Sequence, residues 1–319
     1  MRFKYIIIFL FSVIACNQPS KNTLPQIGFV DAFEDATITQ AKIGFVAALA
    51  NNGFIDGKNI KIIYKNAQGS IPALGQIVNY FLSQKVTLMA TSTTLATLTA
   101  IQKTKTIPIF MMVAPTPKLM KIEGKNGEIP PNLFGVTEDL NYIDSSFSII
   151  PTLIKPKFGK LRIGMVYNQA EPQSVEALAR INALATKYNA VIVAAPVNTS
   201  ADAQLVTQFL LSKDLDCFFA IPDNTVFSAF ETILKNCNQK NIPIFTSEAG
   251  LVKRGALAAF GADMYQWGYQ AGVQAAKFLK SGKTDGLQPE MVKVRKRVYN
   301  PQTAKQYAFT FPKNFEPVK

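Results

Sequence analysis

Short apolar runs alternate with helical patterns along the first half of the chain. The apolar runs predict strands at 26–33, 59–67, 86–92, 107–114 and 132–138. Between them, repeats of three to four residues predict helices at 37–52, at 71–84 and in the segment that ends near 102. Strands alternating with helices favour parallel strands with helices on both faces of the sheet. The first half therefore predicts one doubly wound α/β unit.

The same pattern restarts after a polar loop rich in proline and glycine. Strands are predicted at 160–168, 190–197, 215–222 and 242–248, and helices at 172–189, 201–212 and 225–239. The motif "NIPIF" at 241–245 echoes "TIPIF" at 106–110. The pattern therefore predicts a second unit of the same kind.

Segments beyond Gly250 are left over from the two units. They comprise a small-residue run, a long helix at 263–281, a basic strand and a final helix. If they cross back between the units, the fold is α/β with two doubly wound, Rossmann-like lobes joined by a multi-strand hinge. We assign residues 26–138 plus 258–290 to lobe 1, and 139–257 plus 291–319 to lobe 2. The alternative is one continuous large sheet.

The N-terminus combines basic residues with a short apolar run. This run, residues 5–15, is too short for the roughly 20 apolar residues of a membrane-spanning helix, and its pattern is typical of an export signal. The quartet "VIAC" resembles a bacterial lipobox. We expect 1–15 to be a lipoprotein signal peptide, Cys16 to be lipidated (palmitate among its acyl chains) and 16–25 to be a flexible tether. The alternative is an ordinary signal peptide with an incidental cysteine.

Composition narrows the classes of function. The net charge is +13, but the basic residues are scattered along the chain, so nucleic-acid binding is not expected. Histidine is absent, which removes Ser-His-Asp and Cys-His catalysis and His-containing zinc sites. We expect no enzyme, cofactor or metal. Cys217 and Cys237 are either buried thiols or a disulfide, a choice that spacing leaves open.

Polar residues gather where the predicted strands end. In open α/β sheets, ligands bind beyond the carboxyl ends of the strands, where helix N-termini offer free N–H groups. Each of these residues taken alone could equally cap a helix. Six such strand ends in two facing lobes favour a binding cleft.

Several stretches resemble a known family. They include "NNGFIDGKNIKIIYKNAQG", "GVTED", "GMVYNQAEPQS", "PDNTVFSA", "IPIFTSEAGLVKRGALAAFG" and "YQWGYQAG". The chain resembles the ABC-transporter substrate-binding lipoproteins of the tryptophan/tyrosine-binding type, which have the type I periplasmic-binding-protein fold. It departs from the family pattern at Asp35 and Ala36, where a His-Pro pair is common. It departs again at Thr116, where an acidic residue is common, so ligand identity is open.

The resemblance implies capture of a small solute between the lobes and its delivery to a membrane permease and its ATPase. This solute is expected to be an amino acid, with an aromatic one as an option. It implies a monomer in the cell envelope, lipid-anchored and extracytoplasmic. Alternatives are a sensor that signals to a membrane partner and an envelope enzyme that uses cleft carboxylates. The candidate ligand-binding residues are Phe33, Glu34, Ser92, Thr93, Thr94, Thr116, Thr137, Tyr167, Asn168, Ser174, Asp223, Asn224, Thr225 and Glu248.

Two groups of these residues suit the two poles of an amino acid. Ser92, Thr93 and Thr94 end a strand and begin a helix, so their hydroxyls and N–H groups suit a carboxylate. An ammonium needs an anionic acceptor when it is buried. We expect Asp223 to be this acceptor, with Glu248 as the substitute. The competing interpretation of Asp223 is a plain helix cap.

Overall fold

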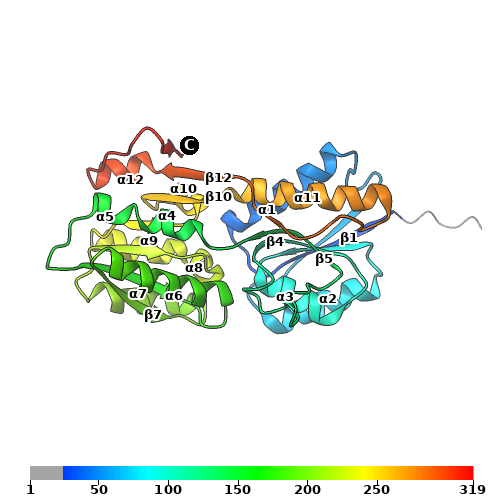
Figure 1. The fold of residues 1–319 in the computed structure, drawn as a ribbon, viewed down its shortest axis with the longest axis horizontal. Helices are drawn as coiled ribbons and strands as arrows, with labels where there is room; N and C mark the ends of the chain where they lie inside the picture. Colours follow the sequence, from blue (N-terminus) through cyan, green and yellow to red (C-terminus); the bar gives the residue numbers. More distant parts are fainter. Residues whose placement is uncertain (1–23, 319) are drawn as a thin grey trace, which may run out of the picture.

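A computed structural model describes residues 24–318. It contains two sheets, one in each of two lobes (Figure 1). The predicted alternation of strands and helices is confirmed, and the alternative of one continuous sheet is wrong. The signal peptide, Cys16 and most of the tether lie outside the described residues. None of the described helices is long and apolar enough to cross a membrane.

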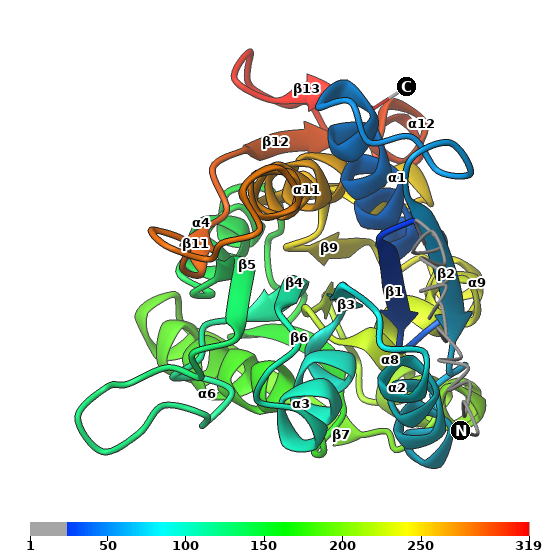
Figure 2. The ribbon, with the colours of Figure 1, turned by 90° about the vertical axis from the view of Figure 1, so that its right-hand side faces the viewer.

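Lobe 1 holds a six-stranded parallel sheet in the order β11-β5-β4-β3-β1-β2. Helices α1 and α11 cover one face, and α2 and α3 cover the other (Figure 2). Its elements are β1 (Gln26–Asp31), α1 (Ala36–Asn51), β2 (Lys61–Asn66), α2 (Ile71–Ser83), β3 (Leu88–Ser92), α3 (Thr94–Lys103), β4 (Ile109–Pro115), β5 (Leu133–Glu138), α11 (Met264–Ser281) and β11 (Glu290–Met291).

Lobe 2 holds a seven-stranded sheet in the order β13-β12-β10-β9-β8-β6-β7, parallel except where β12 meets β10. Its elements are α4 (Tyr142–Phe147), α5 (Ile150–Leu153), β6 (Leu161–Tyr167), α6 (Pro172–Lys187), β7 (Ala190–Pro196), η1 (Ser200–Asp202), α7 (Ala203–Leu211), β8 (Cys217–Ala220), α8 (Asn224–Ser228), α9 (Phe230–Gln239), β9 (Ile244–Thr246), α10 (Ala249–Lys253), β10 (Ala258–Ala262), β12 (Arg295–Tyr299), α12 (Pro301–Gln306) and β13 (Glu316–Pro317).

The chain passes between the lobes at three places in its described part: after β5, after β10 and after β11. The hinge therefore has several strands, as predicted, but two lobe boundaries shift. Residues 258–262 pair as β10 with β9 and β12, so they belong to the lobe 2 sheet. Met291 pairs with Thr137, so it belongs to the lobe 1 sheet. Hydrogen-bond pairing, which apolar patterning does not encode, decides these boundaries.

Helices α1 and α11 pack together through small residues. A Cβ on Gly44 would lie 1.9 Å from the carbonyl oxygen of Tyr265, and one on Gly268 would lie 1.7 Å from that of Ala41. Both distances are far inside van der Waals contact, so glycine is required at these two positions. The close packing holds the first turn of α11 beside the hinge, where it borders the site described below.

Lobe 2 contains the helix expected at 225–239 and also Cys217 and Cys237. The helix expected at 225–239 is divided into α8 and α9, because Ala229 leaves helical geometry at ψ 6°. Cys217 and Cys237 are buried free thiols, and burial raises the pKa of both. The structure therefore favours the buried-thiol interpretation over the disulfide.

Candidate functional site

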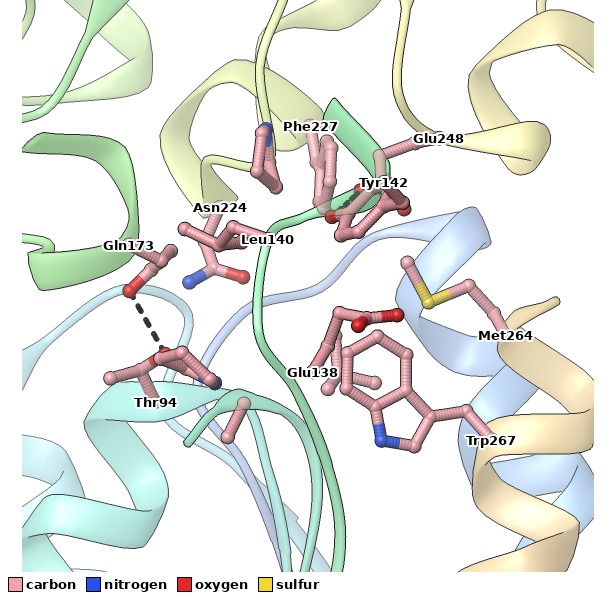
Figure 3. A pocket seen from close by; sticks show the side chains of 14 residues that line it. Thr94, Glu138, Leu140, Tyr142, Gln173, Asn224, Phe227, Glu248, Met264 and Trp267 are labelled. Carbon is pink, nitrogen blue, oxygen red and sulfur yellow. Dashed lines mark hydrogen bonds between the residues drawn. The ribbon is translucent and has the colours of Figure 1, made fainter. Parts of the chain in front are cut away.

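A small cavity of about 30 Å³ lies between the lobes, at the carboxyl ends of the strands (Figure 3). Both lobes and the hinge contribute to it. The lining residues are Thr94, Val113, Ala114, Pro115, Glu138, Leu140, Tyr142, Gln173, Pro222, Asn224, Phe227, Glu248, Met264 and Trp267. The site therefore lies where the sheet topology predicts ligand binding.

One wall of the cavity is apolar. Met264 and Trp267 come from the first turn of α11, and Phe227 comes from α8. The indole Nε1 of Trp267 donates a hydrogen bond of 2.8 Å to the carbonyl of Val136, which fixes the ring. An aromatic or aliphatic group would replace water against this wall, which favours its binding.

Glu248 provides an acidic group with a free oxygen. Its side chain is buried, and Oε1 accepts a hydrogen bond of 2.8 Å from the hydroxyl of Tyr142. Its Oε2 has no hydrogen-bond partner among the described residues. Burial raises the pKa of the Glu248 carboxyl to about 8. A buried carboxylate oxygen without a donor is costly, so this geometry suits a ligand that brings a cation or an N–H group.

Glu138, at the end of β5, is a second carboxylate in the lining, but it already has a cationic partner. The Arg295 guanidinium donates to both of its oxygens, at 2.9 and 2.6 Å. Burial raises the pKa of the Glu138 carboxyl, and the bond from Arg295 opposes that rise. This pair joins two hinge segments, and Glu248 is the lining carboxyl without a cationic partner among the described residues.

The N-terminus of α3 provides a positively polarised end in the cavity, in contrast to the acidic Glu248. Thr94 lines the cavity and begins this ten-residue helix, and no side chain in the described part of the chain caps it. The hydroxyls of Ser92 and Thr93, just before it, are buried and lack a described partner. Free N–H groups and the positive end of a helix dipole suit a carboxylate.

Three non-glycine residues at or beside the cavity have left-handed backbone conformations. Thr93, Val113 and Leu140 have positive φ angles of 79°, 53° and 66°. Such angles are uncommon outside glycine, especially for a β-branched valine, and they typically occur at functional sites. Val113 and Leu140 line the cavity, and Thr93 adjoins Thr94 in its wall.

Asp223 lies outside the cavity lining and is engaged within lobe 2. It caps α8 by accepting from the backbone N–H of Val226 at 2.9 Å, and it also accepts from the N–H of Asn168 and the hydroxyl of Ser174. Asn168 in turn donates to Thr225 at 2.8 Å. These bonds correspond to the capping interpretation of Asp223, and of the two candidate acceptors Glu248 lines the cavity.

Glu171 and Gln173 were not singled out from the sequence. Buried Glu171 accepts from the backbone N–H and the side-chain amide of Asn224, at 3.1 and 2.6 Å, and from the amide of Gln173. Burial, followed by the charge of Asp223, raises the pKa of the Glu171 carboxyl to about 8. Gln173 Oε1 then accepts from the hydroxyl of Thr94 at 3.0 Å. Glu171 thus orients two cavity residues, and Gln173 bridges the lobes.

Three predicted ligand-binding residues line the cavity: Thr94, Asn224 and Glu248. Ser92 and Thr93 adjoin Thr94. The remaining candidates lie outside the lining, and they are Phe33, Glu34, Thr116, Thr137, Tyr167, Asn168, Ser174, Asp223 and Thr225. Several have local roles; Thr116, for example, accepts from the N–H of Leu119 within a turn, at 3.3 Å.

Among the lining residues that sequence reasoning missed, Glu138, Tyr142 and Trp267 come from the hinge or adjoin it. Two signals pointed there: the chain's one tryptophan, and the "GVTED" segment at the crossover. Within the described part of the chain, no cluster of three or more acidic, cysteine or histidine side chains is arranged to hold a metal ion.

Comparisons with known proteins identify the family of the chain. The family model described as ABC transporter substrate binding protein matches residues 26–316. The chain is 34% identical over 260 residues to the tyrosine-binding protein of Clostridioides difficile, covering 82% of this chain and 74% of that protein.

Two solved structures are similar to the whole described body. The ABC domain from Streptococcus pneumonia in complex with L-Trp has a TM-score of 0.81 at 21% identity, covering 91% of this chain and 97% of that one. The ligand-free, open structure of a substrate-binding protein with adhesive properties from Clostridium difficile has a TM-score of 0.66 at 26% identity, covering 93% and 100%. The fold predicted from the resemblance, that of a type I periplasmic binding protein, is confirmed.

Proposed function

The chain belongs to the ABC transporter substrate-binding protein family, a family of solute-binding proteins, and from that premise we propose that it captures an aromatic amino acid between its lobes. It then delivers this solute to a membrane permease and its ATPase. The protein is a monomer on the extracytoplasmic side of the membrane.

The chemistry of the cavity carries this proposal. An amino acid has an ammonium, a carboxylate and a side chain. The free Oε2 of Glu248 suits the ammonium, and the uncapped N-terminus of α3 at Thr94 suits the carboxylate. The wall around Trp267 suits an apolar or aromatic side chain. All three groups line one cavity, which makes an amino acid a better match than a sugar or a nucleoside.

The relatives support an aromatic side chain. One is a tyrosine-binding protein and one is solved with L-Trp. L-tyrosine and L-tryptophan are therefore the first ligands to test.

Binding requires the lobes to move. A cavity of about 30 Å³ has room for one or two water molecules, much less than an amino acid needs. This small volume supports a closed arrangement of the lobes here. The ligand enters when the lobes part at the hinge and is enclosed when they close.

The anchor completes the proposal. Cys16 carries the lipid that holds the protein at the membrane, and residues 16–25 act as the tether. Cys16→Ser should give a protein that is released without detergent and lacks the mass of the acyl chains. A variant that stays in the membrane with the wild-type mass shift would contradict this part alone.

A thermal-shift panel tests the ligand. The purified protein is heated with each of the twenty amino acids and with representative sugars and nucleosides. L-tyrosine or L-tryptophan should stabilise it by about 2.7 kcal/mol at a hundredfold excess over Kd. Stabilisation by a sugar or nucleoside alone would overturn the proposal of an amino-acid ligand.

A further inference from the structure

Arg254 connects the two lobes at a place outside the cavity lining. It follows α10 in lobe 2, and its side chain is 14% exposed. Within lobe 2 its guanidinium donates twice to Glu231 and once to the carbonyl of Phe227, each at 2.8 Å. Across the lobe boundary it donates to Asp35 at 2.6 Å and to Thr37 at 3.2 Å. These five bonds match the five N–H donors of arginine.

Asp35 divides its two oxygens between two tasks. Oδ1 caps α1 in lobe 1 by accepting from the N–H groups of Thr37 and Ile38, at 2.8 and 3.0 Å. Oδ2 accepts from Arg254 of lobe 2, and the Asp35 side chain is 2% exposed. Asp35 is one of the two positions where the sequence departs from the family's common His-Pro pair.

Beside this ion pair, the backbone of lobe 2 also lies close to a side chain of lobe 1. A Cβ on Gly250, in α10, would lie 2.1 Å from Cγ2 of Thr37 in α1. This contact and the Asp35–Arg254 bond both depend on the closed arrangement, because their members belong to different lobes. They would separate together when the hinge opens.

Arg254 also contacts a residue of the ligand cavity. Its Nη2 donates to the carbonyl of Phe227, whose side chain forms part of the apolar wall. The same guanidinium therefore contacts the cavity wall in lobe 2 and the start of α1 in lobe 1. A change at the lobe boundary can reach the cavity through this one side chain.

We propose that Asp35 and Arg254 form a latch that favours lobe closure and so sets ligand affinity from outside the cavity. Within lobe 2, Arg254 keeps Glu231 and the Phe227 carbonyl as partners when the lobes part, and Asp35 keeps its helix-capping bonds. Opening therefore breaks the bonds that cross the lobe boundary. The strongest of these is the Asp35–Arg254 bond, which is short and joins two full charges. Arg254 is a positioning residue in this proposal, which rests on the proposed function only for its effect on affinity.

Asp35→Asn is the sharpest variant, because asparagine caps a helix as well as aspartate but carries no charge. Asp144→Asn is its matched control: Asp144 pairs with Arg180 entirely within lobe 2. Both are made in protein carrying Cys16→Ser. By small-angle X-ray scattering without ligand, Asp35→Asn should have a larger radius of gyration than the parent, whereas Asp144→Asn should not. Identical scattering from the parent and both variants would overturn the latch.

Kinetics test the effect on affinity. For L-tyrosine or L-tryptophan, Asp35→Asn should raise Kd about fivefold, chiefly through faster dissociation. Arg254→Gln should do the same, and the double variant should add little to either single variant. Additive effects would overturn the pairing. If the parent binds neither amino acid, the proposed function fails, and the scattering comparison still decides the latch.

Discussion

The hydroxyl of Tyr142 donates to Oε1 of Glu248 at 2.8 Å, while Oε2 of the same carboxyl has no partner in the described part of the chain. Tyr142 follows the hinge segment that leaves lobe 1, and Glu248 precedes α10 of lobe 2. Residues 106 positions apart thus form an acceptor that is oriented on one side and open on the other.

Glu248→Gln should abolish this acceptor. We expect the Kd for L-tyrosine or L-tryptophan to rise more than tenfold, about 1.4 kcal/mol, because a neutral amide cannot offset the charge of an ammonium. Stability without ligand should stay level or rise, since a buried carboxyl is removed. Isothermal titration and chemical denaturation measure the two effects. Glu176→Gln, on the exposed face of α6, is the control, and an unchanged Kd in Glu248→Gln would exclude Glu248 from the site.

Ligand affinity should depend on pH through the same carboxyl. Its pKa is about 8 in the ligand-free protein because burial disfavours the charged form, and an ammonium binds the ionised form. Affinity should therefore rise by up to about tenfold per pH unit from pH 6 towards pH 8, with release of about one proton per ligand. Titration calorimetry in buffers of different ionisation enthalpy measures this proton. A flat pH profile for the wild type would contradict the mechanism, and Glu248→Gln should give that flat profile.

The free energy of unfolding without ligand should fall as pH rises, whereas ligand affinity rises. The carboxyls of Glu248 and Glu171 have folded-state pKa values of about 8, above the unfolded value of 4.5. Between these values the folded state binds more protons than the unfolded state, so the free energy of unfolding falls as pH rises. Their contribution is fully present below about pH 4.5 and lost by about pH 8. Denaturation midpoints that rose over this range in ligand-free protein would contradict the assignment.

Asp223→Ala should separate structure from binding. The change leaves the N–H groups of Asn168 and Val226 buried without their acceptor, so we expect a loss of about 2–4 kcal/mol in the free energy of unfolding. Ligand Kd, measured well below the melting temperature, should stay within a few-fold of wild type because Asp223 lies outside the cavity lining. A large loss of binding with normal stability would restore Asp223 as the ammonium acceptor.

Gly250→Ala should oppose closure by steric contact. The new methyl group would overlap Cγ2 of Thr37 in the closed arrangement, so we expect weaker binding and a larger radius of gyration. Thr37→Ser removes Cγ2 and keeps the hydroxyl that accepts from Arg254. Adding Thr37→Ser to Gly250→Ala should therefore restore part of the affinity. If the double variant binds no better than Gly250→Ala alone, the contact does not control closure.

Much of the architecture followed from the sequence alone. Apolar runs of strand length, separated by helical repeats, led to two parallel α/β units, because each local period selects one type of element. The interrupted pattern after Gly250 led to a hinge of several strands. The strand-end rule also placed Thr94, Asn224 and Glu248 in the cleft, since the carboxyl ends of parallel strands meet at one edge of a sheet.

The tertiary structure alone decided which of these polar residues face the cavity. Asp223 and Glu248 both follow buried strands of lobe 2, and their local sequences suit a cap and a ligand contact equally. Asp223 accepts from Asn168 in the β6–α6 connection and from Ser174 in the first turn of α6, so it is satisfied within its lobe. Glu248 accepts from Tyr142 and keeps one oxygen without a partner among the described residues. Likewise, Asp35 and Arg254 are 219 residues apart, and their pairing depends on the packing of the lobes. Contacts between distant segments depend on where the hinge places each lobe, and no local pattern in the chain encodes that placement.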